Sequence, residues 1–155
     1  MPARPSIDQY LMGLAVVVKS RSDWPGTKVG CVAAFEGMVR STGYNGTPKG
    51  WEPAKHLPIP EFDEGDRRRE IEPRMLKPYY CHAEENAIVQ AARAGVKLEG
   101  CTFYSTLSCC LPCARMMVNA GAAGFVFLQE WDGQEAEAAL QLLGACGIHV
   151  SKLSI

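Results

Sequence analysis

The sequence predicts an α/β fold of three layers, in which helices cover both faces of a five-stranded mixed sheet. Segments with a helical period of apolar residues alternate with short apolar or β-branched runs along most of the chain. The first two such runs are joined by a two-residue turn, which predicts an antiparallel hairpin, whereas the later runs are separated by helices, as parallel strands require. The length of 155 residues suits one domain with a single core.

The N-terminal part predicts a helix followed by that hairpin. Apolar side chains recur with a helical period over residues 7–20, and Ser6 stands where an N-cap is expected. Residues 29–35 form a continuous run of small apolar side chains, which is typical of a buried strand. The Glu-Gly pair that follows predicts a tight turn, and residues 38–43 can return as the antiparallel partner.

A long irregular segment interrupts the pattern between residues 44 and 80. Prolines punctuate it, and residues 63–72 are densely charged, while residues 70–76 could hold a short helix. A loop of this length inside a compact domain is more often functional than idle, with a solvated insert as the alternative. We therefore expect one domain over residues 1–155 that carries a long insert.

Beyond the insert, helical and strand-like patterns alternate regularly. Glycines at positions 95, 121 and 144 are expected to end the three helices. The expected elements are a helix over 81–94, a strand over 101–106, a helix over 111–120, a strand over 125–128, a helix over 134–143 and a strand over 148–153.

Composition and charge exclude several classes of protein. The formal net charge of −1 gives no sign of a broad nucleic-acid or membrane surface, and no apolar run approaches the ~20 residues that span a bilayer. No secretory signal is evident at the N-terminus, so a cytoplasmic location is expected. The seven cysteines are an odd count, which argues against a disulfide framework; Cys31 and Cys101 lie in strand-like runs and are expected to be buried thiols.

Two short motifs carry the chemistry. His82 and Glu84 open the helix after the insert, and Cys110 and Cys113 open the next helix. Catalytic zinc takes three protein ligands and leaves a fourth position to water, and thiolates with an imidazole suit its softness. At a helix N-terminus the two cysteines would lie on one face of the first turn, where the helix dipole favours thiolates. Glu84 could then act beside the metal as general base and general acid.

Each motif has another interpretation. A Cys-x-x-Cys pair alone could be half of a structural zinc site or a redox pair, and His-x-Glu at a helix start is usually capping and surface charge. A four-cysteine site would need a second pair, and Cys109 is the one extra cysteine nearby. A redox pair would not need His-Ala-Glu. Because both motifs open helices after a strand or loop, together they favour a catalytic zinc centre.

This combination is the zinc-deaminase signature, H-x-E followed by P-C-x-x-C. Beyond it, the chain resembles the deoxycytidylate (dCMP) deaminase family over nearly its full length, which implies the cytidine deaminase-like fold. The stretch Gly-Tyr-Asn-Gly-Thr-Pro-Lys-Gly discriminates best, since other proteins of this fold usually lack it. The matching stretches are Val-Gly-Cys at 29–31, that stretch at 43–50, Cys-His-Ala-Glu-Glu-Asn-Ala-Ile at 81–88 and Cys-Leu-Pro-Cys-Ala-Arg at 110–115.

One departure affects the metal ligands. Cys109 stands where the family has proline, and Pro112 lies inside the cysteine pair instead. A register slip that uses Cys109 and Cys113 is therefore an alternative. We favour Cys110 and Cys113, since they preserve the family spacing and Pro112 is acceptable in a first helical turn.

The resemblance implies hydrolysis of the 4-amino group of cytosine, which converts dCMP to dUMP and ammonia. His82, Cys110 and Cys113 would hold Zn²⁺, which activates water for attack at C4. Glu84 would move protons to N3 and to the leaving amine, and the backbone N–H of Ala83 would bind the pyrimidine carbonyl.

Other substrate contacts follow from the same resemblance. Asn45 matches a sugar-contacting asparagine, although an Asn-Gly pair also suits a turn. Arg21 and Ser22 match a pair that could hold the 5′-phosphate. Tyr104 could line the base pocket or simply pack in the core.

The resemblance also implies regulation and assembly. These deaminases are commonly hexamers that dCTP activates and dTTP inhibits, and a triphosphate effector could bring Mg²⁺. Arg93 matches an interface arginine, although a helix-surface arginine is usually only solvated. Some relatives hold a second zinc in the insert, but His56 and no cysteine stand there, so that site is not expected. The effector and interface candidates are Gly43, Tyr44, Gly46 and Arg93.

Alternative functions differ in substrate or in chemistry. The same site could also accept dCTP or a 5-modified dCMP. A tRNA- or DNA-editing deaminase would need clustered basic residues, but the run of arginines at 67–69 is flanked by acids. A structural zinc module without activity would not explain Glu84 beside an open coordination position.

Overall fold

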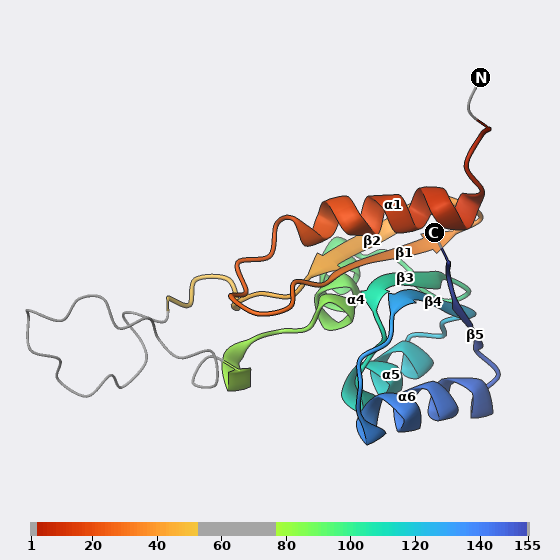
Figure 1. Cartoon of the computed structure of the whole chain (residues 1–155). Coiled ribbons are helices and arrows are strands. Elements are labelled where there is room, and N and C mark those ends of the chain that lie inside the picture. Colours follow the sequence, from red (N-terminus) through yellow and green to blue (C-terminus); the bar gives the residue numbers. More distant parts are fainter. Residues whose placement is uncertain (1–2, 53–76, 155) are drawn as a thin grey trace, which may run out of the picture.

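The computed structural model describes residues 3–52 and 77–154, and these residues form a five-stranded mixed sheet between helices (Figure 1). The strand order is β2-β1-β3-β4-β5, in which β1 is antiparallel to β2 and to β3, and β4 is parallel to β3 and to β5. The predicted fold class is confirmed. The strands are β1 (Gly30–Phe35), β2 (Met38–Tyr44), β3 (Thr102–Leu107), β4 (Gly124–Gln129) and β5 (His149–Lys152).

Helix α1 (Ile7–Lys19) covers one face of the sheet (Figure 1). Ser6 caps it as predicted, since its hydroxyl accepts from the backbone N–H of Gln9 at 3.1 Å and its own N–H donates to the Gln9 side chain at 2.9 Å. The helix lies close to β1 because Gly30 has no side chain: a Cβ there would stand 2.2 Å from the carbonyl oxygen of Ala15. The α1 layer buries Leu11, Met12, Ala15, Val32, Ala34, Tyr104 and Val126.

The opposite face is covered by α4 (Ala83–Ala94), α5 (Leu111–Asn119) and α6 (Gln134–Ala145) (Figure 1). This layer holds the larger core, in which Phe103, Phe125, Met117 and Leu143 are fully buried. Cys31 and Cys101 are fully buried free thiols, as expected. The helices on this face begin near one end of the sheet, where both predicted motifs lie.

Two helix boundaries differ from the sequence expectation. Helix α4 begins at Ala83 and not at Cys81, because Cys81 forms a β-bridge with Gly46 and His82 is extended with φ −79° and ψ 161°. Helix α6 continues through Gly144 to Ala145, and Gly147 takes the left-handed backbone with φ 79°. A helical glycine costs only about 1 kcal/mol, so packing of α6 on the core outweighs it.

Several predictions fall on residues outside the described ranges. These are the short helix at 70–76, His56 and the arginines at 67–69. The insert is described at its ends, where β2 continues to Tyr44 and a single 3₁₀ turn, η1, spans Lys77–Tyr79. Within residues 3–52 and 77–154, no helix is long and apolar enough to cross a membrane.

Candidate active site

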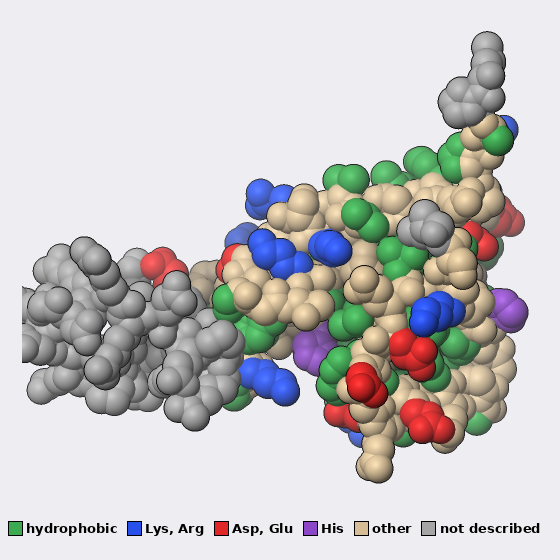
Figure 2. Space-filling model, in the orientation of Figure 1, with side chains coloured by type: hydrophobic (Ala, Val, Ile, Leu, Met, Phe, Trp, Pro, Cys, Tyr) green, Lys and Arg blue, Asp and Glu red, His purple; other side chains and the backbone are tan. Residues whose placement is uncertain are grey.

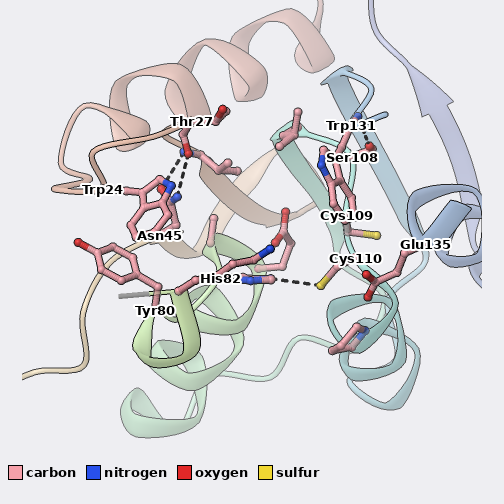
Figure 3. A pocket seen from close by; sticks show the side chains of 16 residues that line it. Trp24, Thr27, Asn45, Tyr80, His82, Ser108, Cys109, Cys110, Trp131 and Glu135 are labelled. Carbon is pink, nitrogen blue, oxygen red and sulfur yellow. Dashed lines mark hydrogen bonds between the residues drawn. The ribbon is translucent and has the colours of Figure 1, made fainter. Parts of the chain in front are cut away.

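Three of the predicted metal ligands converge between the starts of α4 and α5. His82 is the residue before α4, Cys110 is the residue before α5, and Cys113 lies in the first turn of α5. The Nδ1 atom of His82 lies 3.1 Å from the Sγ of Cys110 and 3.5 Å from the Sγ of Cys113 (Figure 3). All three ligand atoms lie within 4.8 Å of one another.

The position of His82 depends on backbone packing around β2. The N–H of Cys81 donates to the carbonyl oxygen of Gly46 at 3.0 Å. In return, the N–H of Gly46 donates to the carbonyl oxygen of Cys81 at 3.1 Å. Helix α4 then crosses β2 at Gly43, where a Cβ would stand 2.1 Å from the Ala83 carbonyl oxygen. The strand end and the missing side chain together fix where the helix begins.

The donor set fits a zinc ion. One imidazole nitrogen and two sulfur atoms are the ligands of a catalytic site that keeps a fourth position open. With about 2.0 Å for a zinc–nitrogen bond and about 2.3 Å for a zinc–sulfur bond, tetrahedral geometry separates nitrogen from sulfur by about 3.5 Å. The separations of 3.1 and 3.5 Å from His82 are close to that value. His82 and Cys110 also line a pocket, so an ion held by these residues would lie at the pocket wall.

The pKa values of the ligands reflect one shared proton. The thiol of Cys113 donates to Cys110, which together with His82 lowers the pKa of Cys110 to about 4. The same hydrogen bond, with burial, raises the pKa of Cys113. The hydrogen bond to Cys110 also raises the pKa of His82. Metal binding needs both thiols deprotonated, so it releases the proton that the sulfur atoms share.

Glu84 lies beside this cluster in the first turn of α4 and is 4% exposed. Burial raises its pKa, and a hydrogen bond from Ser105 opposes that rise. The hydroxyl of Ser105 donates to Oε1 of Glu84 at 2.6 Å and is itself fully buried on β3. This hydrogen bond therefore fixes one oxygen of the Glu84 carboxylate.

These groups open into a pocket of about 530 Å³ with two distinct walls (Figure 3). His82 lies between the walls. The first wall carries Trp24, Thr27, Asn45 and Tyr80, and the second carries Ser108, Cys109, Cys110, Trp131 and Glu135. Val29, Lys77, Ala83, Glu84, Leu107 and Pro112 complete the lining.

The first wall is held by aromatic packing and by one buried polar network. The rings of Trp24 and Tyr80 lie 4.2 Å apart between centroids, and the Tyr80 hydroxyl donates to Asp23 at 3.1 Å. Asn45 is 9% exposed, and its side chain bonds to Ser22, to the N–H of Val29 and to the carbonyl oxygen of Thr27. The side chain of Asn45 is therefore fixed in the pocket wall by hydrogen bonds, and its role goes beyond allowing a turn.

The residues predicted to contact the phosphate and the base, Ser22, Arg21 and Tyr104, do not line the pocket. Ser22 is only 3% exposed, and its hydroxyl donates inward to Asn45. Arg21 is exposed in the loop after α1 and does not line the pocket. Tyr104 lies in the α1 layer, on the face of the sheet away from the pocket, and its hydroxyl donates to Asp8 at 2.7 Å. Packing, the alternative interpretation of Tyr104, fits this position.

The proposed effector residues are also placed. Gly43 is required for the close approach of α4, and the Tyr44 carbonyl oxygen accepts from Asn86 at 2.7 Å. Gly46 forms the bridge to Cys81, and Arg93 is exposed in the last turn of α4. Gly43, Tyr44 and Gly46 thus hold α4 and the residue before it, His82, against the end of β2, next to Asn45.

Cys109, which replaces the motif proline, lies outside the ligand cluster. It is 1% exposed and lines the pocket next to Cys110. Burial and the neighbouring carboxylate of Glu84 raise its pKa, so it is a protonated thiol. The cluster of His82, Cys110 and Cys113 follows the favoured register and not the slipped one.

Sequence reasoning missed several residues of this site. Ser105, Trp24, Tyr80, Lys77 and Trp131 were not assigned roles. Alternation along the strand at 101–106 could have placed Ser105 on the face that covers Glu84, since residues on one face of a strand recur every second position. The pocket aromatics come from loops with no periodic pattern, so the sequence offered no comparable signal for them.

Three candidate metal ligands lie beside a buried carboxylate, and His82, Cys110 and Glu84 line a pocket. This arrangement is typical of a zinc-dependent hydrolase. The family model for the cytidine and deoxycytidylate deaminase zinc-binding region matches residues 5–129. The chain belongs to this family, as the dCMP deaminase resemblance predicted.

Named relatives agree with this assignment. The deoxycytidylate deaminase of Homo sapiens is 33% identical over 149 residues, which cover 93% of this chain and 78% of that protein. The one from Saccharomyces cerevisiae is 36% identical over 97% of this chain, but the chain spans only 46% of that protein. The dCMP deaminase from cyanophage S-TIM5, solved in complex with dCMP and dUMP, is 26% identical with a TM-score of 0.75, covering 98% of this chain and all of that one.

Proposed function

We propose that this chain catalyses the zinc-dependent hydrolytic deamination of dCMP to dUMP and ammonia, which supplies dUMP for deoxynucleotide synthesis. The observation that carries the proposal is the buried carboxylate of Glu84 beside His82, Cys110 and Cys113, at the floor of a pocket of about 530 Å³. That volume suits a small ligand such as a nucleotide, since ligand pockets typically enclose about 300–1,000 Å³. The deoxycytidylate deaminase names of the relatives support the same substrate.

His82, Cys110 and Cys113 would hold the zinc ion, which lowers the pKa of water to about 7 and so supplies hydroxide at neutral pH. Glu84 accepts the proton that water loses as its oxygen adds to C4 of cytosine, and delivers this proton to N3. It then takes the second proton from the new hydroxyl group and gives it to the amine, which leaves as ammonia while C4 becomes a carbonyl. The burial that raises the pKa of Glu84 favours the steps in which it takes up a proton, because the carboxylate of an acid with a higher pKa is a stronger base.

The first turn of α4 would orient the pyrimidine ring. The backbone N–H of Ala83 belongs to the first residue of α4, and such N–H groups have no partner within their own helix. Ala83 lines the pocket beside Glu84, so this N–H can donate to the pyrimidine carbonyl. Trp24 and Tyr80, packed together on the first wall, offer apolar surface to the base and the sugar.

The charge distribution around the pocket supports a phosphate on the first wall. Figure 2 shows basic side chains gathered near the C-terminal end of α1, and acidic side chains over the α6 side. Lys77 lines the pocket three residues before Tyr80, and Arg21 is exposed in the loop after α1. Glu135, on the second wall, would repel a phosphate there. We assign the 5′-phosphate to Lys77 and, as the family resemblance implied, to Arg21.

Assembly and regulation extend the proposal. Several apolar side chains of α1 and β2 are largely exposed, and such surface is typical of subunit contacts; they are Tyr10, Val17, Met38 and Val39. They support a homo-oligomer. As the family resemblance implies, we propose a hexamer that dCTP with Mg²⁺ activates and dTTP inhibits near residues 43–46 and Arg93. All seven cysteines are free thiols, and free thiols are typical of proteins in the reducing cytoplasm, where we propose that this protein acts. Light scattering with and without each nucleotide measures the assembly.

A substrate panel tests the proposed reaction. Purified, zinc-loaded protein is given dCMP, dCTP, 5-methyl-dCMP, deoxycytidine and an adenosine-containing tRNA, and ammonia and deaminated product are measured. The expected result is that kcat/KM is highest for dCMP. Turnover of dCTP but not dCMP would contradict the substrate assignment, and activity on tRNA alone would contradict the reaction on free nucleotides.

A further inference from the structure

The hydrogen-bond network around Asn45 determines how this side chain faces the pocket. Its Oδ1 atom lies 2.8 Å from the backbone nitrogen of Val29, which can only donate a hydrogen bond. Its Nδ2 atom lies 3.0 Å from the carbonyl oxygen of Thr27, which can only accept one. The two contacts therefore exclude the flipped amide on chemical grounds.

Ser22 completes this arrangement from behind the wall. Its hydroxyl oxygen lies 2.7 Å from both the backbone carbonyl oxygen and the Oδ1 atom of Asn45, so its single hydrogen is shared between these two acceptors. It also accepts from the backbone N–H of Trp24 at 3.2 Å, so all of its contacts point into the protein. Ser22 is 3% exposed and is not among the residues that line the pocket, which places it out of reach of a bound phosphate.

One donor of Asn45 is left over. An amide nitrogen carries two hydrogens, and Thr27 takes one of them, while Oδ1 already accepts from Val29 and Ser22. The second N–H has no partner among the residues that the structure describes, and Asn45 lines the pocket (Figure 3). Asn45 therefore presents one fixed donor to the pocket, which matches an acceptor oxygen on the ligand.

We propose that Ser22 is a positioning residue, which locks the Asn45 amide so that its remaining N–H donates to the sugar hydroxyl of the substrate. In dCMP the only free sugar hydroxyl is at C3′, because the 5′ oxygen is esterified. This inference rests on the proposed function. It moves Ser22 from the phosphate to the sugar, and it makes recognition of the 3′-hydroxyl depend on a side chain that never touches the substrate.

A comparison of two substrates tests the proposal. The kinetic constants are measured for dCMP and for 2′,3′-dideoxycytidine monophosphate, which keeps the base and the phosphate but lacks the hydroxyl. Ser22→Ala is expected to lower kcat/KM for dCMP about five- to tenfold through KM, and to change it less than about twofold for the dideoxy nucleotide. A role on the phosphate, or a purely structural role, would lower both substrates equally, and that result would overturn the proposal.

Two further variants separate the hydroxyl from the shape of the side chain. Ser22→Thr and Ser22→Val introduce side chains of the same shape, so any strain in the buried site is common to both. Ser22→Thr is expected to keep more of the preference for dCMP than Ser22→Val does. Equal preference in the two variants would overturn the proposal even if Ser22→Ala does not fold.

Ser41→Ala is the matched control. Ser41 is also a buried serine, and it donates at 2.7 Å to the carbonyl oxygen of Ala87 between β2 and α4. This variant is expected to lower stability without changing the preference between the two nucleotides. Failure of the proposed function is distinguishable, since the wild-type protein would then turn over neither nucleotide.

Discussion

The two walls of the pocket are built in different ways. Around the second wall and the floor, His82, Glu84, Cys110 and Cys113 lie at the N-terminal ends of two helices that pack on the same face of the sheet. The first wall holds Trp24, Asn45 and Tyr80 on three loop or strand-end segments, joined by hydrogen bonds and ring contacts. One half is fixed by regular secondary structure, and the other by a network of individual contacts.

This difference separates chemistry from recognition. The N-terminus of a helix fixes the relative positions of neighbouring side chains, as in His-x-Glu and Cys-x-x-Cys. A metal site can therefore be encoded in short motifs. Substrate recognition on the first wall depends on residues such as Ser22, which act through a neighbour. We therefore expect variants of the helical half to abolish the reaction, and variants of the first wall to change KM and substrate preference.

The largest effect is expected for Cys110→Ser. It removes one of the three ligands, so zinc content should fall far below one ion per chain and turnover of dCMP should be lost. Cys109→Ser is the matched control, because Cys109 is adjacent and buried but lies outside the cluster. Measurement of zinc by atomic absorption decides the register: loss of metal in the Cys109 variant and its retention in the Cys110 variant would contradict this account.

Gly43→Ala should break the link between the two halves. The new Cβ would meet the Ala83 carbonyl oxygen at 2.1 Å and the Ala87 nitrogen at 2.3 Å, both of them backbone atoms of α4. Overpacking of this kind costs about 1–3 kcal/mol, so the midpoint of urea unfolding should fall and zinc affinity should decrease as His82 shifts.

Gly13→Ala is the control for that substitution. Gly13 lies in α1, and a Cβ there would meet nothing within 4 Å. This change should stabilise the protein by about 0.5–1 kcal/mol, because alanine favours the helix. If both variants shift the unfolding midpoint in the same direction, the packing role of Gly43 is wrong.

Ser105→Ala should reduce the rate of the chemical step. The variant removes the 2.6 Å hydrogen bond to Glu84 and leaves the carboxylate free to rotate in its buried site. We expect kcat to fall about tenfold with KM and zinc content nearly unchanged, since general acid–base catalysis contributes about 10²–10⁴-fold and depends on position. Steady-state kinetics with zinc analysis makes the measurement, and an unchanged kcat would show that Glu84 does not need Ser105.

The smallest effect is expected for Lys77→Ala. Removal of this cation from the pocket should raise KM for dCMP severalfold at low salt and leave deoxycytidine, which has no phosphate, unaffected. Lys97→Ala is the control, because Lys97 is exposed, pairs with Glu99 at 2.8 Å and does not line the pocket. An equal change for both substrates would argue against a phosphate contact at Lys77.

The fold and the helical half of the site were predictable because each rests on local patterns. Apolar periodicity gave the order of helices and strands, and the spacing in His-x-Glu and Cys-x-x-Cys gave the residues that the structure brings together. The end of α6 was misplaced at Gly144, since tertiary packing overrides the local preference of a single glycine.

The first wall was less predictable because its contacts join distant parts of the chain. Ser22 reaches Asn45 across 23 residues, and Tyr80 reaches Asp23 across 57. Neither partner is marked by spacing or composition. The family resemblance implied a phosphate contact for Ser22, and its hydrogen bonds to Asn45 show instead that its hydroxyl faces inward.

Glu84→Gln tests the central claim most directly, since glutamine keeps the size of the side chain but cannot take up a proton. Zinc content and the initial rate of dUMP formation from dCMP are measured on the same preparation. We expect one zinc ion per chain, as in the wild-type protein, with a rate lower by about 10²–10⁴-fold. Loss of zinc in this variant would make Glu84 part of the metal site, and near-normal turnover would show that another group moves the protons.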